Sequence, residues 1–360
     1  AFAKRMNMFL YDCWYVVGWR DRVQPGELVK ATVLNQSLVL YRGSDHRLTA
    51  MADRCPHRLA PLSLGRVEGD ALRCMYHGIK FGCDGRCIEV PGQDRVPGAM
   101  RVRTYPVAEH GCWIWVWMGD PEKADLRLLP PGLIGNDDPE WVVSGGQMDY
   151  QANYELINDN LLDLSHISFV HAKTLARHSL QWGETRPQIQ ELKRGVSVER
   201  WLVSDPVPVH IAEDPDVRLD RWTYYEFLVP GIFLLTSRYY PVGTAERIGF
   251  RTPEADPLFQ NMTQQAVTPV TATTSIYYYT CGHRMRDTRP GRIEQQLASI
   301  EKAFAEDRTI IEAQQRVIQQ SPGEEMVATT NDGAVMRFRR IMSRLIKEQE
   351  LGEPREQVLP

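Results

Sequence analysis

The sequence predicts an α+β protein with two domains, an all-β domain at residues 1–125 and a mixed domain at residues 126–360. Three observations support this prediction. Short β-type runs separated by glycine and proline fill the first part, and this pattern ends near residue 125. Strand-rich sequence follows, and a long amphipathic helical pattern covers residues 292–320. A chain of 360 residues is long enough for two hydrophobic cores.

The first domain is expected to consist of short strands bounded by turn residues. The expected strands cover residues 28–34, 38–41, 71–73, 79–81 and 113–117. The last run, Trp-Ile-Trp-Val-Trp, combines aromatic and β-branched residues, which is typical of strands. Gly119-Asp120-Pro121 then breaks the strand, and the proline-rich stretch at residues 129–132 is an extended connection.

Two cysteine–histidine pairs in this domain form a metal-binding motif. Cys55 and His57 are a C-x-H pair, and Cys74 and His77 are a C-x-x-H pair. This asymmetric spacing is typical of a Rieske [2Fe–2S] centre, in which two cysteines bind one iron and two histidines bind the other. Glycine and proline follow each pair, so each pair is expected on a hairpin-like loop. The motif therefore predicts electron transfer.

A structural zinc site is the alternative, because Cys83 and Cys87 follow the second pair closely. Zinc sites often use C-x-x-C knuckles, and the sequence contains none. The odd count of 7 cysteines indicates reduced thiols rather than a disulfide framework. Cys13, Cys112 and Cys281 are expected to be ordinary core or surface residues.

The overall composition is consistent with a cytoplasmic enzyme. The net charge of −4, with acidic and basic residues mixed, gives no reason to expect nucleic acid or an anionic membrane as a partner. No apolar run approaches the roughly 20 residues of a spanning helix. Residues 1–10 lack the hydrophobic region of a secretory signal. No flavin or nicotinamide fingerprint is present, so NAD(P)H is expected to act only through another protein.

The second domain contains a helical stretch with two histidines. Four polar residues in it are spaced by seven, three and three and are expected to share one helix face: Asn153, Asn160, Asp163 and His166. His171 follows His166 by five residues, which is roughly 140° around an ideal helix. If both imidazoles bind one ion, the helix must end or distort between them, near residues 168–170.

A carboxylate in the C-terminal helix is the candidate third ligand, because non-haem iron sites combine two histidines with one carboxylate. Apolar residues between 292 and 320 recur in steps of four and three, and Asp307 occupies one place in this buried stripe. A lone ionised carboxylate there is costly unless it is paired or binds a metal. Glu306 falls off the stripe and is expected to be solvated. The alternative for Asp307 is a salt bridge to Arg308 or Arg316.

Strand-rich sequence lies between these two stretches. Residues 221–240 are dense in aromatics, and residues 264–281 form two β-type runs around an expected turn at 268–271. Such a sheet would pack the long helix and form an apolar pocket above the iron. Arg238 and His283 are candidate contacts for a substrate anion, although each also has an ordinary structural role as the alternative. The polar stretch that begins at Gly282 is expected to cover the pocket.

Segments across nearly the whole chain resemble the Rieske non-haem iron oxygenases. These segments are WYVVGW, CPHRLAPLSLG, CMYHGIKFGCDG, WIWVWMGDPEKAD and DNLLDLSHISFVH. Within that superfamily the chain is most similar to the oxygenase components of the vanillate O-demethylase and dicamba monooxygenase group. The resemblance implies His166 and His171 as ligands of a mononuclear Fe(II), and it places an iron-binding aspartate in the C-terminal helix, where Asp307 lies.

The resemblance also implies the fold and the assembly. It implies a Rieske domain joined to a helix-grip (START-like) catalytic domain with a central antiparallel sheet, and a head-to-tail homotrimer. In such trimers electrons pass from the cluster of one subunit to the iron of its neighbour. Asp163 matches the carboxylate that bridges a cluster histidine, here His77, and an iron histidine, here His166. Asn160 would support Asp163 from the same helical face.

The implied reaction uses dioxygen as co-substrate. A separate reductase, with or without a ferredoxin, supplies the electrons, and a small aromatic substrate is hydroxylated. Oxidative O- or N-dealkylation that releases an aldehyde is favoured, and ring hydroxylation or dihydroxylation is the alternative. A Rieske electron carrier without oxygenase chemistry is the alternative from another class. Such a carrier has no need for His166, His171 and Asp307.

Overall fold

The chain folds into two compact units in the computed structural model, which describes residues 8–351. One unit consists of residues 11–129. The other contains Pro130 onwards together with the segment that ends at Leu10. The domain boundary predicted at residue 125 lies close to this division and stays a prediction. Within residues 8–351, no helix is both long enough and apolar enough to span a membrane.

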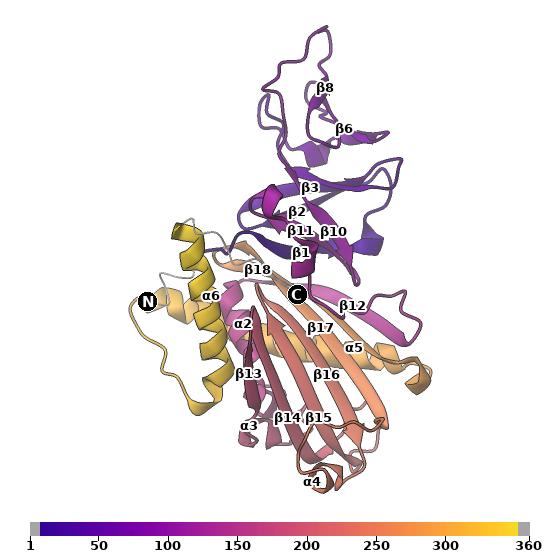
Figure 1. The fold of residues 1–360 in the computed structure, drawn as a ribbon, viewed down its shortest axis with the longest axis vertical. Helices are drawn as coiled ribbons and strands as arrows, with labels where there is room; N and C mark the ends of the chain where they lie inside the picture. The colour runs from indigo at the N-terminus through magenta and orange to yellow at the C-terminus, as the bar shows by residue number, and fades with distance from the viewer. Residues whose placement is uncertain (1–7, 352–360) are drawn as a thin grey trace. The chain divides into compact units, whose positions relative to one another are not determined.

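The first unit is built from three antiparallel sheets (Figure 1). One contains β1 (Cys13–Trp19), β11 (Trp113–Met118) and β10 (Val107–His110). The second contains β2 (Leu28–Val33), β3 (Gln36–Arg42), β4 (Leu48–Ala52) and β9 (Thr104–Tyr105). The third contains β5 (Arg66–Glu68), β6 (Ala71–Arg73), β7 (Lys80–Phe81) and β8 (Cys87–Glu89). The predicted all-β character of this part is confirmed, and β11 is buried along its whole length.

The second unit contains a seven-stranded antiparallel sheet. Its strands in spatial order are β12 (Trp141–Tyr150), β18 (Thr274–Arg284), β17 (Phe259–Thr271), β16 (Ile232–Tyr240), β15 (Arg218–Leu228), β14 (Gly195–Pro206) and β13 (Gln188–Leu192). The predicted antiparallel sheet is confirmed.

The turn expected at residues 268–271 is wrong, because β17 continues through Pro269. The last residue of β17 that pairs with β16 is Ala266, so Pro269 needs no N–H on that side. The stretch at Gly282 is also not a covering loop, since β18 extends to Arg284.

Helices pack on this sheet. The longest is α5 (Arg292–Gln320), whose bounds match the predicted helix and which crosses one face of the sheet (Figure 1). The others are α2 (Tyr154–Leu162), α3 (Gln181–Glu184), α4 (Thr244–Arg247) and α6 (Gly333–Leu351). Met8 is anchored here, because the Tyr154 hydroxyl donates a hydrogen bond to its carbonyl at 3.1 Å.

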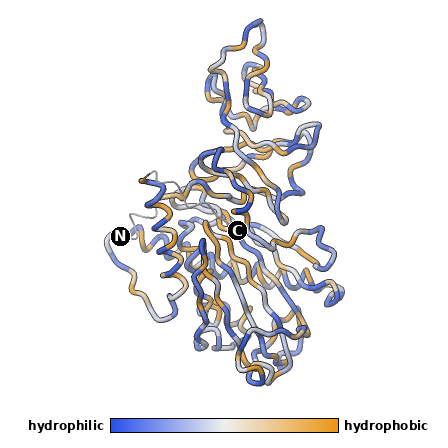
Figure 2. Tube along the Cα trace, viewed as in Figure 1, coloured by the Kyte–Doolittle hydropathy of each residue, from blue (hydrophilic) through white to orange (hydrophobic). Residues whose placement is uncertain are grey.

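The two faces of the sheet have different roles, because side chains alternate along each strand. Hydrophobic and hydrophilic residues follow each other closely along the strands (Figure 2). Odd-numbered residues of β16 and β17 line a cavity beneath α5. Even-numbered residues on the other face, such as Trp222 and Tyr240, form a separate hydrophobic cluster. One face of the sheet therefore builds the site, and the other packs independently of it.

Candidate functional site

The two cysteine–histidine loops in the first unit have the same backbone structure. In each loop the cysteine N–H donates to the carbonyl five residues later, at 2.8 Å. The residue four places later donates back to the cysteine carbonyl, at 2.8 Å for Cys55 and 2.9 Å for Cys74. That residue has positive φ in both loops, 58° at Leu59 and 74° at Gly78. The chain thus presents each cysteine and its histidine on matching turns.

The thiols of these loops face inward and the imidazoles face outward. Cys55 and Cys74 are buried, whereas His57 and His77 are exposed, with ring centroids 4.6 Å apart. Burial raises the pKa of the Cys55 thiol to about 11, so this thiol needs a bound cation to ionise at neutral pH. Two adjacent inner thiols and two adjacent outer imidazoles fit a Rieske cluster, with cysteines on the inner iron and histidines on the outer one.

The spacing of the four side chains argues against a single zinc ion. Bonds to zinc of about 2.3 Å or less place any two ligand atoms within about 4.6 Å of each other. Within residues 8–351, the metal-ligand group whose three atoms lie within 4.8 Å of one another is His166, His171 and Asp307. No three of the four residues Cys55, His57, Cys74 and His77 form such a group, so they do not present a preformed single-ion site. Cys83 is exposed, and Cys87 donates to a backbone carbonyl at 3.4 Å.

Arg73 on β6 supports the second loop. Its Nη1 donates to the carbonyl of Gly78 at 2.5 Å. Its other guanidinium nitrogens contact Glu68 at 2.8 Å and Glu89 at 2.9 Å. The hydrogen bond from Arg73 to Glu68, together with those from Arg66 and Lys80, lowers the pKa of Glu68 to about 2. The sheet beneath the loop is therefore tied to it by charged groups.

The second candidate centre begins where α2 ends. The helix stops at Leu162, and the five-residue 3₁₀ helix η5 (Leu164–Ser168) carries His166. A break in the helix was expected near residues 168–170, but α2 ends before His166. The expectation that four polar residues share a helix face is wrong, because Asn153 caps the start of α2 and Asp163 lies at its end.

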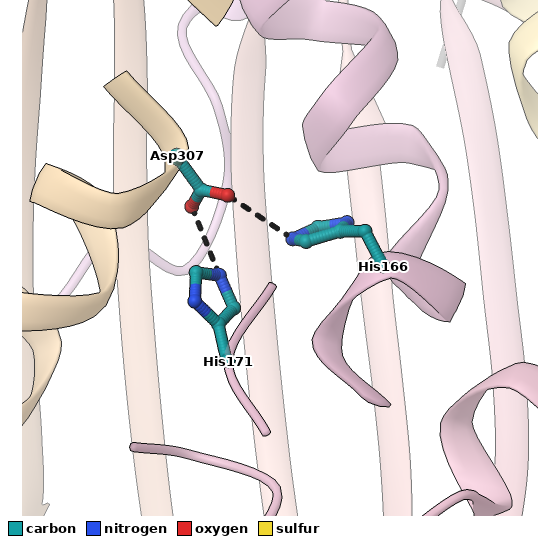
Figure 3. Close-up of side chains that lie close together, drawn as sticks. All are labelled: His166, His171 and Asp307. Carbon is teal, nitrogen blue, oxygen red and sulfur yellow. Dashed lines mark hydrogen bonds and ion pairs between the residues drawn. The ribbon is translucent and has the colours of Figure 1, made fainter. Parts of the chain in front are cut away.

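Asp307 lies between the two histidines (Figure 3). Its Oδ2 is 3.1 Å from Nε2 of His171, and its Oδ1 is 3.5 Å from Nε2 of His166. Each Nδ1 has another partner: that of His166 donates to the carbonyl of Asp163 at 2.6 Å, and that of His171 to Glu306 at 2.8 Å. Both imidazoles are therefore protonated at Nδ1 and present Nε2 to a metal.

These separations fit one metal ion. Ligand atoms about 2.1 Å from an ion and at right angles to each other lie about 3 Å apart. The 3.1 and 3.5 Å distances to Asp307 are close to this value. Burial also lowers the pKa of His166, which favours the neutral form that binds metals. Two histidines and one aspartate are the ligand set of non-haem Fe(II) oxygenases, which keep other positions open.

The partners of these ligands differ from the predictions. Glu306 is partly solvated, with 30% of its side chain exposed, but its Oε2 also accepts hydrogen bonds from His171 and Thr174, both at 2.8 Å. Asn160 does not contact Asp163 but donates to Oδ1 of Asp307 at 3.1 Å. A helical pattern predicts the face on which a side chain lies, but it does not predict which residues of other segments contact that side chain. No sequence signal identified Glu306 as the partner of His171.

Asp163 has two separate hydrogen bonds. Its backbone carbonyl, and not its carboxylate, accepts from His166. Its Oδ1 accepts from the N–H of Ser165 at 2.9 Å and caps η5. The expected carboxylate contact to His166 is therefore replaced by a backbone contact, because the chain turns at Asp163 and aims its carbonyl at the imidazole.

An elongated cavity extends from the three ligands. It encloses about 820 Å³ of empty space, including open solvent at its mouth, and all three ligands contribute to its wall. Much of the rest of the wall is apolar, including Leu164, Leu175, Phe233, Leu235, Ile300 and Phe304. A cavity of this kind binds an aromatic ring by burying its surface.

The two residues predicted to contact a substrate anion do not line this cavity. Arg238 lies between two cavity-lining residues of β16, so alternation turns it to the opposite face, where its guanidinium carbon is 5.0 Å from the Trp222 ring. His283 is fully buried and contacts Gln296 at 3.1 Å. Two other basic residues line the wall instead, His210 and Arg221. Alternation along a strand does not indicate which face of the sheet holds the cavity.

Both parts of the chain match known protein families. Residues 13–106 match the Rieske [2Fe-2S] domain. Residues 150–348 match the vanillate O-demethylase oxygenase C-terminal domain.

Similar proteins extend over nearly the whole chain. The iron-sulfur subunit of the toluene-4-sulfonate monooxygenase system of Comamonas testosteroni is 36% identical, covering 96% of this chain and 99% of that protein. A vanillate O-demethylase oxygenase subunit of Pseudomonas sp. is 31% identical, covering 96% and 98%. The oxygenase component of chloroacetanilide N-alkylformylase of Rhizorhabdus wittichii is 31% identical, covering 97% and 98%. The crystal structure of dicamba monooxygenase bound to dicamba superposes with a TM-score of 0.84 at 26% identity, covering 95% and 99%.

Proposed function

The chain belongs to the Rieske non-haem iron oxygenases of the vanillate O-demethylase group, and we propose that it hydroxylates an alkyl carbon of a small aromatic substrate. One observation carries this proposal. The chain combines two Rieske-type loops with a separate two-histidine, one-aspartate set in the wall of an apolar cavity. An electron carrier needs the loops alone, so the second set and its cavity favour an oxygenase.

We assign the ligands as follows. Cys55, His57, Cys74 and His77 hold the [2Fe–2S] cluster, and His166, His171 and Asp307 hold the mononuclear iron. When bound, the two metal centres supply the electrons and the dioxygen activation that insertion of oxygen into a C–H bond requires.

The protein's own groups orient the reaction. Asn160 donates to Oδ1 of Asp307, and Glu306 accepts from Nδ1 of His171, so both keep their ligands in place. The apolar wall holds the aromatic ring and excludes water from it. An alkyl carbon at the end of the substrate is then presented to the open side of the ligand set.

Oxidative dealkylation is the favoured outcome. An aryl methyl ether, O2, two electrons and two protons give a hemiacetal and water, and the hemiacetal collapses to a phenol and formaldehyde. Relatives named vanillate O-demethylase and chloroacetanilide N-alkylformylase support this outcome.

Hydroxylation of a methyl group bound directly to the ring is the second candidate. Relatives with 36% and 37% identity are named for toluene-4-sulfonate, whose methyl carbon is attached to the ring. The product is then a benzylic alcohol, and no aldehyde is released by cleavage. None of the relatives named here supports ring hydroxylation.

We also propose a separate reductase, with or without a ferredoxin, because the relatives are named as subunits or components of oxygenase systems. A head-to-tail homotrimer is proposed as the assembly. Large apolar side chains are exposed near His57 and His77, as in interaction surfaces. These side chains are Leu59, Leu64, Met75 and Tyr76. A molar mass in solution three times that of the chain would support the trimer.

The test is a substrate screen with a surrogate reductase and NADH. Aryl methyl ethers, N-alkyl anilides and toluene-4-sulfonate are supplied, and oxygen uptake, aldehyde and alcohol are measured. We expect one aldehyde or one benzylic alcohol for each O2 consumed. The control is Asp307→Ala, which should keep the cluster absorption and lose the mononuclear iron together with product. A hydroxylated ring with its alkyl group intact would contradict the proposal.

A further inference from the structure

Three buried N–H donors in the cavity wall have no hydrogen-bond partner. One is Nε1 of Trp182, and the other two belong to basic residues. Nδ1 of His210, in the turn after β14, is one of them, and the His210 side chain is 4% exposed. Nε of Arg221 on β15 is the other. Both residues line the cavity that contains the metal ligands. Leaving a buried donor unsatisfied costs about 1–3 kcal/mol, so three donors in one wall, against the single unsatisfied acceptor Oε1 of Gln265, indicate a ligand that carries acceptors.

The partners of His210 fix which nitrogen carries its proton. Nη2 of Arg292 donates to Oδ1 of Asn261 at 3.3 Å, and a guanidinium can only donate. The amide nitrogen of Asn261 therefore faces Nε2 of His210, 2.8 Å away. Nε2 must accept this bond, so the proton is on Nδ1, the nitrogen without a partner. Asn261 and Arg292 are thus positioning residues that make His210 a donor.

Arg221 has no direct ion pair with a carboxylate among the described residues, although its charge interacts with that of the buried Asp205. Its one direct hydrogen bond runs from Nη2 to the Ser237 hydroxyl at 3.1 Å. Its guanidinium carbon lies 4.8 Å from the Trp182 ring and 5.3 Å from the Tyr239 ring, so two aromatic faces hold it in the wall. A half-buried cation without a carboxylate in direct contact is stabilised by a bound anion.

The surroundings of His210 are positive as well. Burial, followed by the charges of Arg292 and Arg221, lowers the pKa of His210 to about 3, so its ring is neutral in the folded protein. Arg289 contributes in the same direction, and its Nη2 donates to the His210 carbonyl at 3.4 Å. Two carboxylates oppose these charges, since Asp287 acts on Arg292 and Asp205 interacts with Arg221. The three arginines outnumber them, so this end of the cavity has an excess of positive charge.

The sheet register separates this end from the metal ligands. Ser237 pairs with Asn261, and the next cavity-lining pair is Leu235 with Thr263. Along the facing helix α5, Gln296 contacts the first of these rows through His283, whereas Asp307 lies eleven residues further on. The cavity thus has a polar end, an apolar middle and a metal-binding end.

We propose that His210 and Arg221 form an oxyanion subsite that binds the carboxylate or sulfonate of the aromatic substrate while its alkyl carbon faces the iron ligands. This inference rests on the proposed function and specifies its substrate class. The two donors recognise an oxygen atom of a singly charged acid, and the apolar middle of the cavity takes the ring. A neutral amide would give the donors an oxygen acceptor but no negative charge to pair with Arg221.

The test compares acids with neutral isosteres in the iron-loaded, oxidised enzyme by titration calorimetry. The probes are 4-methoxybenzoate against 4-methoxybenzamide, and toluene-4-sulfonate against toluene-4-sulfonamide. We expect Arg221→Gln to weaken binding of the preferred acid about 10-fold to 100-fold and to leave the amides unchanged. The matched control is Arg238→Gln. Arg238 also has a buried Nε without a partner and lies over an aromatic ring, but on the opposite face of the sheet, so this variant should bind the acids as the unmodified enzyme does.

A second series tests the position of the His210 proton. The amide nitrogen of asparagine overlaps Nδ1 of histidine, and that of glutamine overlaps Nε2. His210→Asn should therefore bind the acid within about threefold of the unmodified enzyme, whereas His210→Gln and His210→Leu should lose about 10-fold. The reverse order for Asn and Gln would overturn the assignment of the donor.

The outcomes separate this inference from the proposed function. Equal binding of acids and amides, unchanged binding in Arg221→Gln, or no binding of either acid would overturn the subsite. Turnover of neutral substrates alone would overturn it too and leave the oxygenase intact. Tight, Arg221-dependent binding of an acid without any oxygenated product would support the subsite and contradict the proposed function. Comparison of the two acids identifies whether carboxylate or sulfonate is preferred.

Discussion

Glu306 is a residue whose role follows from its contacts alone. Its Oε2 accepts from Nδ1 of His171 and from the hydroxyl of Thr174, both at 2.8 Å. A carboxylate in this position fixes the orientation of the imidazole and makes Nε2 a better metal ligand. Glu306 therefore acts on the iron through His171 and not by direct contact.

We expect Glu306→Gln to lower the affinity for the mononuclear iron about 10-fold to 100-fold, because the neutral amide holds the imidazole less strongly. Iron retained after dialysis against increasing chelator is the measurement, and absorption of the [2Fe–2S] cluster should not change. Glu294→Gln, at an exposed position of the same helix, is the control. Unchanged iron retention in Glu306→Gln would show that the contact is not functional.

The residues of the site differ in how far the sequence predicts them. Asp307 is predictable, because an ionised carboxylate among the buried apolar positions of a helix is costly and indicates a partner or a metal. Arg221 and His210 are not, because alternation along β15 allows either face to hold the cavity, and the His210 donor depends on Asn261, which lies about fifty residues away along the chain. Contacts between distant segments carry this information, and a local pattern does not.

At the level of elements, the two cluster loops repeat one set of hydrogen bonds with different residues at the strained position. Gly78 has φ of 74°, and a Cβ there would lie 2.9 Å from Cγ of Pro91. Leu59 occupies the same place in the first loop with φ of 58°. The first loop accepts a side chain in this conformation, whereas the second is closed against Pro91.

Gly78→Ala is expected to destabilise the first unit by about 1–2 kcal/mol, the usual cost of a left-handed alanine, and to speed cluster loss. Thermal unfolding and the decay of cluster absorption measure the two effects. Gly69→Ala is the matched control, with φ of 64° and open space around its Cβ, in the turn between β5 and β6. It should lower stability to a similar degree without faster cluster loss. Equal rates of cluster loss in both variants would contradict this role for Gly78.

Whole elements were predictable where their periodicity is strong. The bounds of α5 follow from its apolar repeat, and β2, β6 and β11 follow from compact β-type runs. The turn predicted at Pro269 is wrong, because the sequence does not show that the pairing of β17 with β16 stops at Ala266. The end of α2 at Leu162 was not predicted for a related reason. Asp163 is the C-cap of this helix, and helix periodicity does not reveal a cap.

At the level of the whole molecule, each chain carries its two candidate metal sites in separate units. In the proposed trimer, we expect the Asp163 carboxylate to contact His77 of the neighbouring chain while the Asp163 backbone carbonyl accepts from His166. Only Oδ1 of this carboxylate caps η5, and the bond to His166 comes from the backbone carbonyl. The charge of the Asp163 carboxylate can therefore be removed without removing the hydrogen bonds that shape the chain at this point.

Asp163→Asn tests this link. Asparagine keeps an oxygen for the cap on Ser165 and leaves the carbonyl bond to His166 intact, so we expect normal contents of both metals and a normal rate of cluster reduction by the reductase. Turnover should fall by about 10-fold to 100-fold, because the expected contact between His77 and a charged carboxylate is lost. Iron analysis, cluster absorption and product formation measure the three quantities. A variant that turns over at the normal rate would exclude a bridging role.

The helix α5 sets the distance between the two ends of the substrate cavity. Gln296 at the polar end of the cavity and Asp307 at the metal end lie eleven residues apart on it, about 16 Å of helical rise. Ile300 and Phe304 point into the cavity between them. Substitutions at these two positions can therefore change how wide a ring is accepted, while the distance from anchoring group to oxidised carbon stays fixed. Length and width of the substrate are in this way set by different parts of one element.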